Sequence, residues 1–162
     1  MAKLKLLSEE YEEIDYQLIA IHTSIEDYRL AFLINKNLPI NLSKCNQDIE
    51  IQENNVELQF SRFSYDDEKN NISWNLIQNK NQEYQSSTTL DTGLFANTIA
   101  QVSTNSYILP EFKKVDYFLK VDNCFSEDEI QETLLSLKNI QKISTVYTVA
   151  IENIKSKNNL IF

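Results

Sequence analysis

The sequence predicts a single α+β domain over residues 1–162, with a mainly antiparallel or mixed sheet and two main helices on one face of it. Three observations favour this fold class. Two segments carry helical periodicity and start signals, and each follows a segment that alternates like a β-strand. The middle of the chain alternates polar and apolar residues between polar turns, as antiparallel hairpins do. A length of 162 residues is that of one domain.

The first strand and helix are expected before residue 38. Residues 14–22 place apolar side chains on both faces of a strand, which predicts a central position in the sheet. A helix is expected over 25–37, with Ser24 as its N-cap and Pro39 after its end. The apolar face expected to pack on the sheet consists of Ile25, Tyr28, Phe32, Leu33 and Ile34.

The middle of the chain is expected to form antiparallel sheet. Segments 56–60 and 72–76 alternate apolar and polar residues on either side of the polar stretch 66–70, so they are predicted to pair as a hairpin. Trp74 lies in the second segment, where core packing is the ordinary role of a tryptophan. Residues 79–93 are polar and turn-rich, which predicts a mobile loop with room for one edge strand.

Alternation over residues 115–121 predicts a further strand with a well-defined buried face. A slip by one residue would bury two charges, so the register is expected to be firmly fixed. The side chains expected in the core are Val115, Tyr117, Leu119 and Val121, and those expected on the opposite face are Asp116, Phe118 and Lys120.

A second helix is expected to begin at Ser126. Ser126 and Glu129 have the spacing of a reciprocal capping box, and Phe125 and Ile130 have that of a hydrophobic staple. The stripe expected to be buried is Ile130, Leu134 and Leu137. Residues 143–151 are rich in β-branched side chains and predict the last strand.

The two ends of the chain show a weak internal repeat. Asp15-Tyr16-Gln17-Leu18 and Asp116-Tyr117-Phe118-Leu119 each precede an expected Ser-capped helix and a further strand. The repeat predicts two β-α-β units around a β-hairpin insertion, which is a ferredoxin-like arrangement.

Composition excludes several classes of function. Gly93 is the one glycine, whereas phosphate-cradling loops need several, so P-loops and dinucleotide-binding turns are excluded. The formal net charge is -9 with Arg29 and Arg62 as the only arginines, which argues against nucleic-acid and anionic membrane partners. Cys45 and Cys124 fit no zinc or redox spacing. No apolar run has the length of a secretory signal or a membrane span, so we expect a cytoplasmic protein.

A short segment in the last third resembles a known family signature. It reads Leu109-Pro110-Glu111-Phe112-Lys113-Lys114-Val115-Asp116-Tyr117. The segment is similar to the signature of the IPExxxVDY family, a group of small bacterial proteins of unknown function. The matching positions are Pro110, Glu111, Val115, Asp116 and Tyr117, and Leu109 stands where the family name has isoleucine. The resemblance extends to chain length and implies no activity, cofactor or catalytic residue.

Two interpretations of this motif are open. In the structural one, Glu111 and Asp116 accept hydrogen bonds from backbone donors or lysines where the strand begins. Asp116 would lie beside Lys114 and Lys120, and the Tyr117 hydroxyl would bond Glu111 or a backbone carbonyl. In the functional interpretation, Glu111, Asp116 and Tyr117 form a ligand or partner site.

His22 is the one histidine, at the expected handover from the first strand to the first helix. Ligands collect at that edge of α/β sheets, so His22 is a candidate general base or anion-binding group. The plainer interpretation is a histidine that is hydrogen-bonded at the end of a strand. An acidic run is either a solvated face or a site for a cation or basic partner, and it comprises Glu9, Glu10, Glu12, Glu13 and Asp15.

Three functions remain open from the sequence. A non-enzymatic interaction or regulatory protein with a protein partner is favoured, because no catalytic constellation is visible. A small-molecule-sensing domain would bind a metabolite near His22 or at a dimer interface. An enzyme would use His22 with Glu111 or Asp116. The sequence indicates no cofactor, metal, nucleic-acid or membrane partner, and the candidate ligand or partner residues are His22, Glu111 and Asp116.

Overall fold

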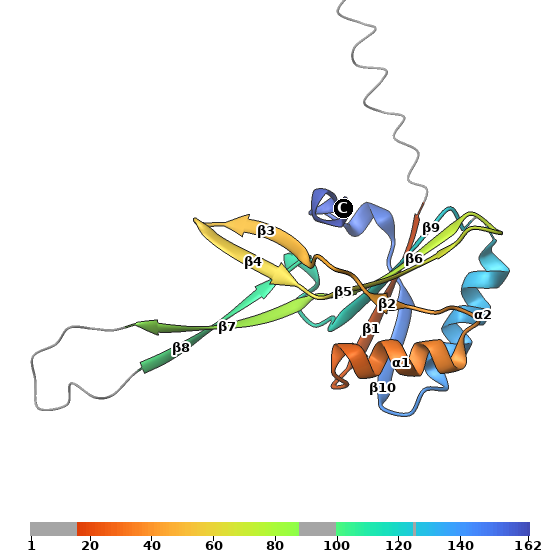
Figure 1. Ribbon diagram of the computed structural model, residues 1–162, viewed down its shortest axis with the longest axis horizontal. Coiled ribbons are helices and arrows are strands. Elements are labelled where there is room, and N and C mark those ends of the chain that lie inside the picture. The colour runs from red at the N-terminus through yellow and green to blue at the C-terminus, as the bar shows by residue number, and fades with distance from the viewer. Residues whose placement is uncertain (1–15, 88–99, 125) are drawn as a thin grey trace, which may run out of the picture.

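The computed structural model describes residues 16–87, 100–124 and 126–162, which form a six-stranded sheet, two separate hairpins and two α-helices (Figure 1). In spatial order, the strands of the sheet are β10 (Ile143–Thr148), β1 (Tyr16–Thr23), β9 (Tyr117–Asp122), β6 (Ile72–Gln78), β5 (Arg62–Asp67) and β2 (Ser43–Lys44). The hairpins are β3 (Ile49–Glu53) with β4 (Val56–Phe60), and β7 (Lys80–Ser87) with β8 (Ala100–Tyr107). The helices are α1 (Asp27–Asn37) and α2 (Glu127–Lys138), with 3₁₀ turns η1 (Pro110–Phe112), η2 (Ile151–Asn153) and η3 (Lys157–Leu160).

Four strands of the sheet form two interleaved β-α-β units. Helix α2 leads from β9 to β10, and β1 lies between these two strands. Helix α1 follows β1, and β9 lies between β1 and β6. All neighbouring pairs are antiparallel. The order β10-β1-β9-β6 is that of a ferredoxin-like sheet, so the α+β class and the paired units predicted from the repeat are confirmed.

Both faces of the sheet are covered, which makes two apolar cores. Helices α1 and α2 pack on one face against Ile19 and Ile21 of β1. The β3–β4 hairpin and the C-terminal segment, residues 149–162, pack on the other face, against Leu18 and Ala20 (Figure 1). The expectation that the first strand is central, with apolar groups on both sides, is therefore confirmed. The β7–β8 hairpin extends away from this body in Figure 1.

Helix α1 differs from the prediction in its start and in its buried face. It begins at Asp27 after Glu26, and Ser24 does not cap it. Its buried residues are Leu30, Ala31 and Ile34, while Tyr28 is 62% exposed and Phe32 is 64% exposed. The helix has two apolar stripes, and the aliphatic one packs on the sheet. Of the predicted face, Ile25 and Ile34 are buried and Leu33 is half-buried, whereas the two aromatic residues face outward.

The predicted hairpin around residues 66–70 has a different first strand. The strand that pairs with β6 across this turn is β5, whereas β4 pairs with β3. Asn54 and Asn55 join β3 to β4 with φ angles of 51° and 62°, a region that asparagine enters more readily than most residues. The polar stretch 79–93 contains the strand β7, and its residues 88–93 lie outside the described ranges, as do the acidic run of residues 9–15 and Phe125.

The register predicted for the strand over 115–121 is confirmed with one correction. Tyr117 and Leu119 are buried beneath the helices, and Phe118 is buried in the opposite core. Lys120 pairs with Asp122, with 3.0 Å between Nζ and Oδ1. Val115 lies in the opposite core rather than beneath the helices, because it precedes β9 in the turn after η1 and does not share the alternation of the strand.

Helix α2 begins where the capping pattern predicts. Ser126 is the N-cap, and its hydroxyl accepts a hydrogen bond from the backbone amide of Glu129 at 3.4 Å. The other half of the expected box is replaced by a bond from the Cys124 thiol to the Glu129 carboxylate, also 3.4 Å. Ile130, Leu134 and Leu137 are buried as predicted.

We expect replacement of Ser126 by alanine to lower the free energy of unfolding by about 1 kcal/mol, because the first turn of α2 loses its side-chain acceptor. Urea denaturation followed by circular dichroism measures the change. Ser136→Ala, at a helix-interior position, is the control. Equal midpoints for Ser126→Ala and the unaltered chain would show that the cap contributes nothing.

Candidate functional site

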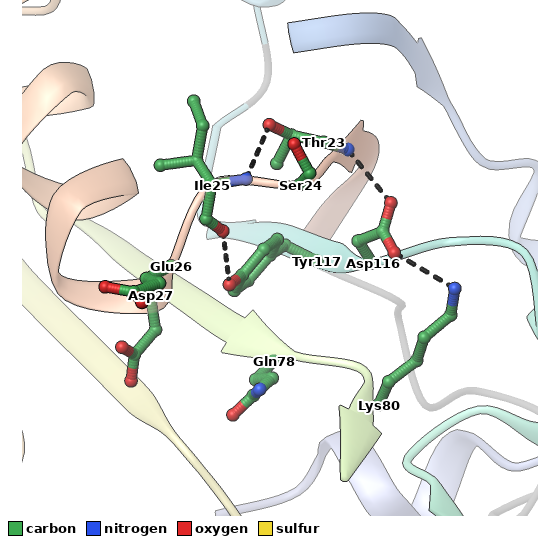
Figure 2. A pocket seen from close by; sticks show the side chains of 9 residues that line it. All are labelled: Thr23, Ser24, Ile25, Glu26, Asp27, Gln78, Lys80, Asp116 and Tyr117. Atoms are coloured by element: carbon green, nitrogen blue, oxygen red, sulfur yellow. Dashed lines mark hydrogen bonds and ion pairs between the residues drawn. The ribbon is translucent and has the colours of Figure 1, made fainter. Parts of the chain in front are cut away.

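A cavity of about 430 Å³ opens where β1 leads into α1, at the edge expected from the position of His22 (Figure 2). One wall is the connecting segment 23–27. The other walls come from Gln78 and Lys80, at the β6–β7 junction, and from Asp116 and Tyr117 of the motif. Two motif residues therefore lie on a cavity, and both come from the point where β9 begins.

Asp116 ties together the segments that surround this cavity. Its Oδ2 accepts a hydrogen bond from the amide of Thr23 at 2.9 Å, and its Oδ1 lies 3.0 Å from the Nζ of Lys80. Its own amide donates to the carbonyl of Ile21, and its carbonyl accepts from the amide of Asn79. Asp116 was expected beside Lys114 and Lys120, but its cationic partner is Lys80. Gln78 pairs with Tyr117 and the amide of Asn79 bonds the carbonyl of Asp116, so Lys80 follows directly beside the start of β9.

Tyr117 fastens the segment that leads into α1. Its hydroxyl donates to the carbonyl of Ile25 at 2.8 Å (Figure 2). Of the two acceptors expected from the sequence, Glu111 or a backbone carbonyl, the structure has the second. Burial raises the pKa of Tyr117 strongly, and the nearby carboxylates of Asp27 and Asp116 raise it further. The hydroxyl therefore remains a protonated donor at neutral pH.

We expect Tyr117→Phe to lower the free energy of unfolding by about 1 kcal/mol, the usual net contribution of one hydrogen bond. The ring stays in the core, so the loss reports on the hydroxyl alone. Thermal and urea unfolding measure it, with Tyr65→Phe as a control whose ring also packs against the helix-side core. A loss no larger than that of the control would mean that the bond to Ile25 does not stabilise the fold.

Glu111 lies in η1, several residues before Asp116, and does not line the cavity. Its Oε1 accepts hydrogen bonds from the amides of Lys155 and Ser156 at 2.7 and 2.8 Å, and its Oε2 accepts from the Ser156 hydroxyl at 3.1 Å. Partial burial alone would raise the pKa of Glu111, but the hydrogen bonds from Ser156 and Lys155 outweigh it and hold this pKa below its usual value. Glu111 thus anchors the C-terminal segment.

The side chain of His22 forms a hydrogen bond or ion pair with neither Glu111 nor Asp116, the two carboxylates proposed as its catalytic partners. Its Nε2 lies 3.1 Å from the Tyr147 hydroxyl, and the two rings are 5.5 Å apart between centroids. Thr23, the next residue, lines the cavity, and His22 does not. Asp116 bonds backbone groups of Ile21 and Thr23, on either side of His22, but of His22, Glu111 and Asp116 only Asp116 lines the cavity.

Sequence reasoning missed Asn79, the residue that holds the motif loop, residues 109–115, in place. The side chain of Asn79 is fully buried and makes three hydrogen bonds to backbone groups of this loop. Its Nδ2 donates to the carbonyls of Phe112 and Val115 at 2.9 and 2.8 Å, and its Oδ1 accepts from the amide of Leu109 at 3.0 Å. The asparagine stands at the start of a polar stretch, where nothing in the sequence distinguishes it from a turn residue.

The charge of the cavity limits its chemistry. Glu26, Asp27 and Asp116 contribute carboxylates, and Lys80 contributes a cation that already pairs with Asp116. Across residues 16–87, 100–124 and 126–162, no three His, Cys, Asp or Glu side chains are placed to hold a metal ion. The cavity is suited to a polar ligand that carries an amine or hydroxyl groups.

The outward side of α1 is a second candidate surface. Tyr28 and Phe32 are one turn apart on it and are both more than 60% exposed. Beside them a groove of about 360 Å³ runs between α1 and residues 139–142. Exposed aromatic side chains are enriched where proteins bind proteins, so this surface is a candidate interface.

Comparison with protein-family models, with curated proteins and with solved structures gives no match. In the part of the chain that the structure describes, neither helix is long and apolar enough to span a membrane.

Proposed function

We propose that this chain is a non-enzymatic interaction or regulatory protein, a cytoplasmic member of the IPExxxVDY group whose partner is another protein. The observation that carries the proposal is the outward row of α1, where Tyr28 and Phe32 leave large aromatic surfaces in solvent. A helix that packs on a sheet needs one apolar face, and α1 already has one in Leu30, Ala31 and Ile34. The second apolar row therefore favours a partner that covers it.

The bonding of the motif supports the same proposal. Glu111 is occupied by Lys155 and Ser156, Asp116 by Thr23 and Lys80, and the Tyr117 hydroxyl by Ile25. Groups engaged in this way join segments of the fold. This favours the structural interpretation of the signature.

The β7–β8 hairpin gives independent support. Among the described strands, β7 and β8 pair only with each other, so both strands have an unpaired edge. A two-stranded hairpin is marginally stable in water by itself, and an unpaired edge can accept a strand from another protein.

A matched pull-down tests the proposal. The tagged chain and its Tyr28→Ser/Phe32→Ser variant are cross-linked in native lysate, and captured proteins are quantified by mass spectrometry. We expect a stoichiometric partner with the unaltered chain and at least about a tenfold loss with the variant, since central aromatic residues commonly carry most of an interface energy. Equal recovery with both proteins would contradict the proposal. A melting temperature within about 2 °C of that of the unaltered chain shows that the variant is folded.

A small-molecule-sensing domain is the second candidate, favoured by the cavity beside Asp116. Its test is a thermal-shift screen of polar amine-containing and hydroxyl-containing metabolites, because a ligand selective for the folded chain raises its melting temperature. Gln78→Ala, which alters the wall of the cavity, should remove the shift. A flat screen, or a shift that persists in Gln78→Ala, would count against this function.

A further inference from the structure

The outward side of α1 carries two neighbouring rows of side chains. Tyr28, Phe32 and Lys36 follow one another at intervals of four residues, so they form one row along the helix. Arg29 and Leu33 belong to the next row. Both aromatic rings and both cations are exposed, and Leu33 is half-buried. This surface thus combines aromatic rings with positive charge.

The groove beside α1 has positive charge only. Its charged lining residues are Arg29 and Lys36 from α1 and Lys142 from the loop before β10, and all three are exposed. The ion pairs found among the described residues involve Lys44, Lys80 and Lys120, and none of these lines the groove. The three cations are therefore available to a ligand. Their grouping stands out in a chain whose formal net charge is -9.

Apolar side chains accompany these cations. Leu33 and Ile140 line the groove from its two sides, and Ile140 is itself buried in the helix-side core. With Tyr28 and Phe32 next to the groove, a partner would meet cations and apolar surface within the span of one helix. A partner segment that complements both the cations and the apolar surface carries carboxylates interspersed with apolar side chains.

We propose that this face of α1, formed by Tyr28, Phe32 and the cationic groove, binds an acidic segment of a partner protein that carries aromatic or aliphatic side chains between its carboxylates. The inference rests on the proposed interaction function and specifies the chemistry of the partner. Arg29 offers a carboxylate a two-pronged donor, and Lys36 and Lys142 add point charges. The apolar side chains of the segment would cover Tyr28 and Phe32.

Charge argues against two other occupants. Two copies of this face in a symmetric dimer would bring cations against cations, because such an interface uses the same patch on both subunits. A nucleic acid presents a dense row of phosphates, and three cations on a chain with a net charge of -9 would neutralise few of them. An acidic peptide needs few cations and also provides the apolar contacts.

The test uses a fluorescein-labelled random copolymer of glutamate and tyrosine, with labelled polyglutamate and a labelled single-stranded RNA for comparison. Anisotropy titrations are made with the full chain, with Arg29→Glu/Lys36→Glu/Lys142→Glu and with Phe32→Ser. The matched control is Lys69→Glu/Lys114→Glu/Lys157→Glu, which changes the net charge equally at exposed lysines that do not line the groove. Sedimentation of the unaltered chain and of the groove variant reports any self-association and whether the substitutions abolish it.

We expect saturable copolymer binding that weakens by at least about tenfold in the groove variant and changes by less than about twofold in the control. Phe32→Ser should weaken binding of the copolymer more than that of polyglutamate. Equal losses in both charge variants, tighter binding of the RNA, or self-association abolished by the groove substitutions would each overturn the inference. The copolymer could bind the groove variant as tightly as the unaltered chain while recovery of a partner still requires Tyr28 and Phe32. That result would overturn the acidic partner proposed here and leave the proposed interaction function intact.

Discussion

Replacement of Asn79 by alanine should lower the free energy of unfolding by about 3–5 kcal/mol, the largest effect that we expect from one substitution in this chain. The amide of Asn79 is buried and serves three backbone groups: the amide of Leu109 and the carbonyls of Phe112 and Val115. Truncation leaves all three without this partner, and the bonds to Val115 and Leu109 are buried. Each such buried group costs about 1–3 kcal/mol, and local relaxation recovers part of the sum.

Asn79→Asp is the sharper variant. It keeps the shape of the side chain but exchanges its two donors for a carboxylate oxygen that faces two carbonyls. We expect it to destabilise the chain at least as much as alanine does, and to do so more as the pH rises through the range where a carboxyl ionises. Urea denaturation monitored by the fluorescence of Trp74 measures both variants.

Asn81→Ala is the matched control for Asn79. Asn81 lies two residues later in β7, and its side chain donates one hydrogen bond, to the carbonyl of Gln59. That single, more exposed bond should be worth about 0.5–1.5 kcal/mol. A loss for Asn79→Ala no greater than for Asn81→Ala would mean that the motif loop holds its shape without the buried amide.

The contrast between β9 and Asn79 shows which parts of the fold the sequence could predict. Tyr117, Phe118 and Leu119 alternate faces under the strong constraint that a slip would bury charge, so periodicity alone is sufficient to place them. Asn79 takes part in no periodic pattern. Its role depends on residues about thirty positions later, whose backbone groups reach it only after the chain has folded.

Helix α1 shows a second limit of sequence reasoning. Its position was predicted within two residues, but its sequence contains two apolar stripes, and periodicity cannot tell which one a sheet will accept. The smaller stripe of Leu30, Ala31 and Ile34 fits beneath the helix, and the stripe with Phe32 is left outside. Ile25 and Ile34 of the predicted face are buried, so the error concerns Tyr28 and Phe32, which form the surface on which the proposed interaction depends.

The lining of the cavity shows which neighbours the sequence could not predict. The handover from β1 to α1 was one candidate place for a ligand because of His22, and a cavity lies there. Its polar walls, however, come from Gln78 and Lys80, which meet Asp116 because the β6–β7 junction lies beside the start of β9. Such long-range neighbours follow from strand order, which one sequence does not reveal.

Glu111→Gln should lower the free energy of unfolding by about 2 kcal/mol at neutral pH, because hydrogen bonds to a charged acceptor are worth more than those to a neutral one. The variant keeps one acceptor oxygen for the amides of Lys155 and Ser156 and replaces the other with a donor beside the Ser156 hydroxyl. The C-terminal segment, which covers one core with Ile154 and Leu160, should loosen as a result.

The dependence of this effect on pH distinguishes a charged anchor from a merely well-packed side chain. Hydrogen bonds hold the pKa of Glu111 in the folded chain below the value of about 4.3 expected when it is unfolded. Its charge therefore stabilises the fold above that value, and the contribution is lost as the pH falls through the folded-state pKa. The difference between the unaltered chain and Glu111→Gln should be constant from about pH 7 to pH 5 and shrink below about pH 4. Glu152→Gln, an exposed position in η2, should show no such difference, and a gap for Glu111→Gln that stays the same down to acidic pH would refute the role of its charge.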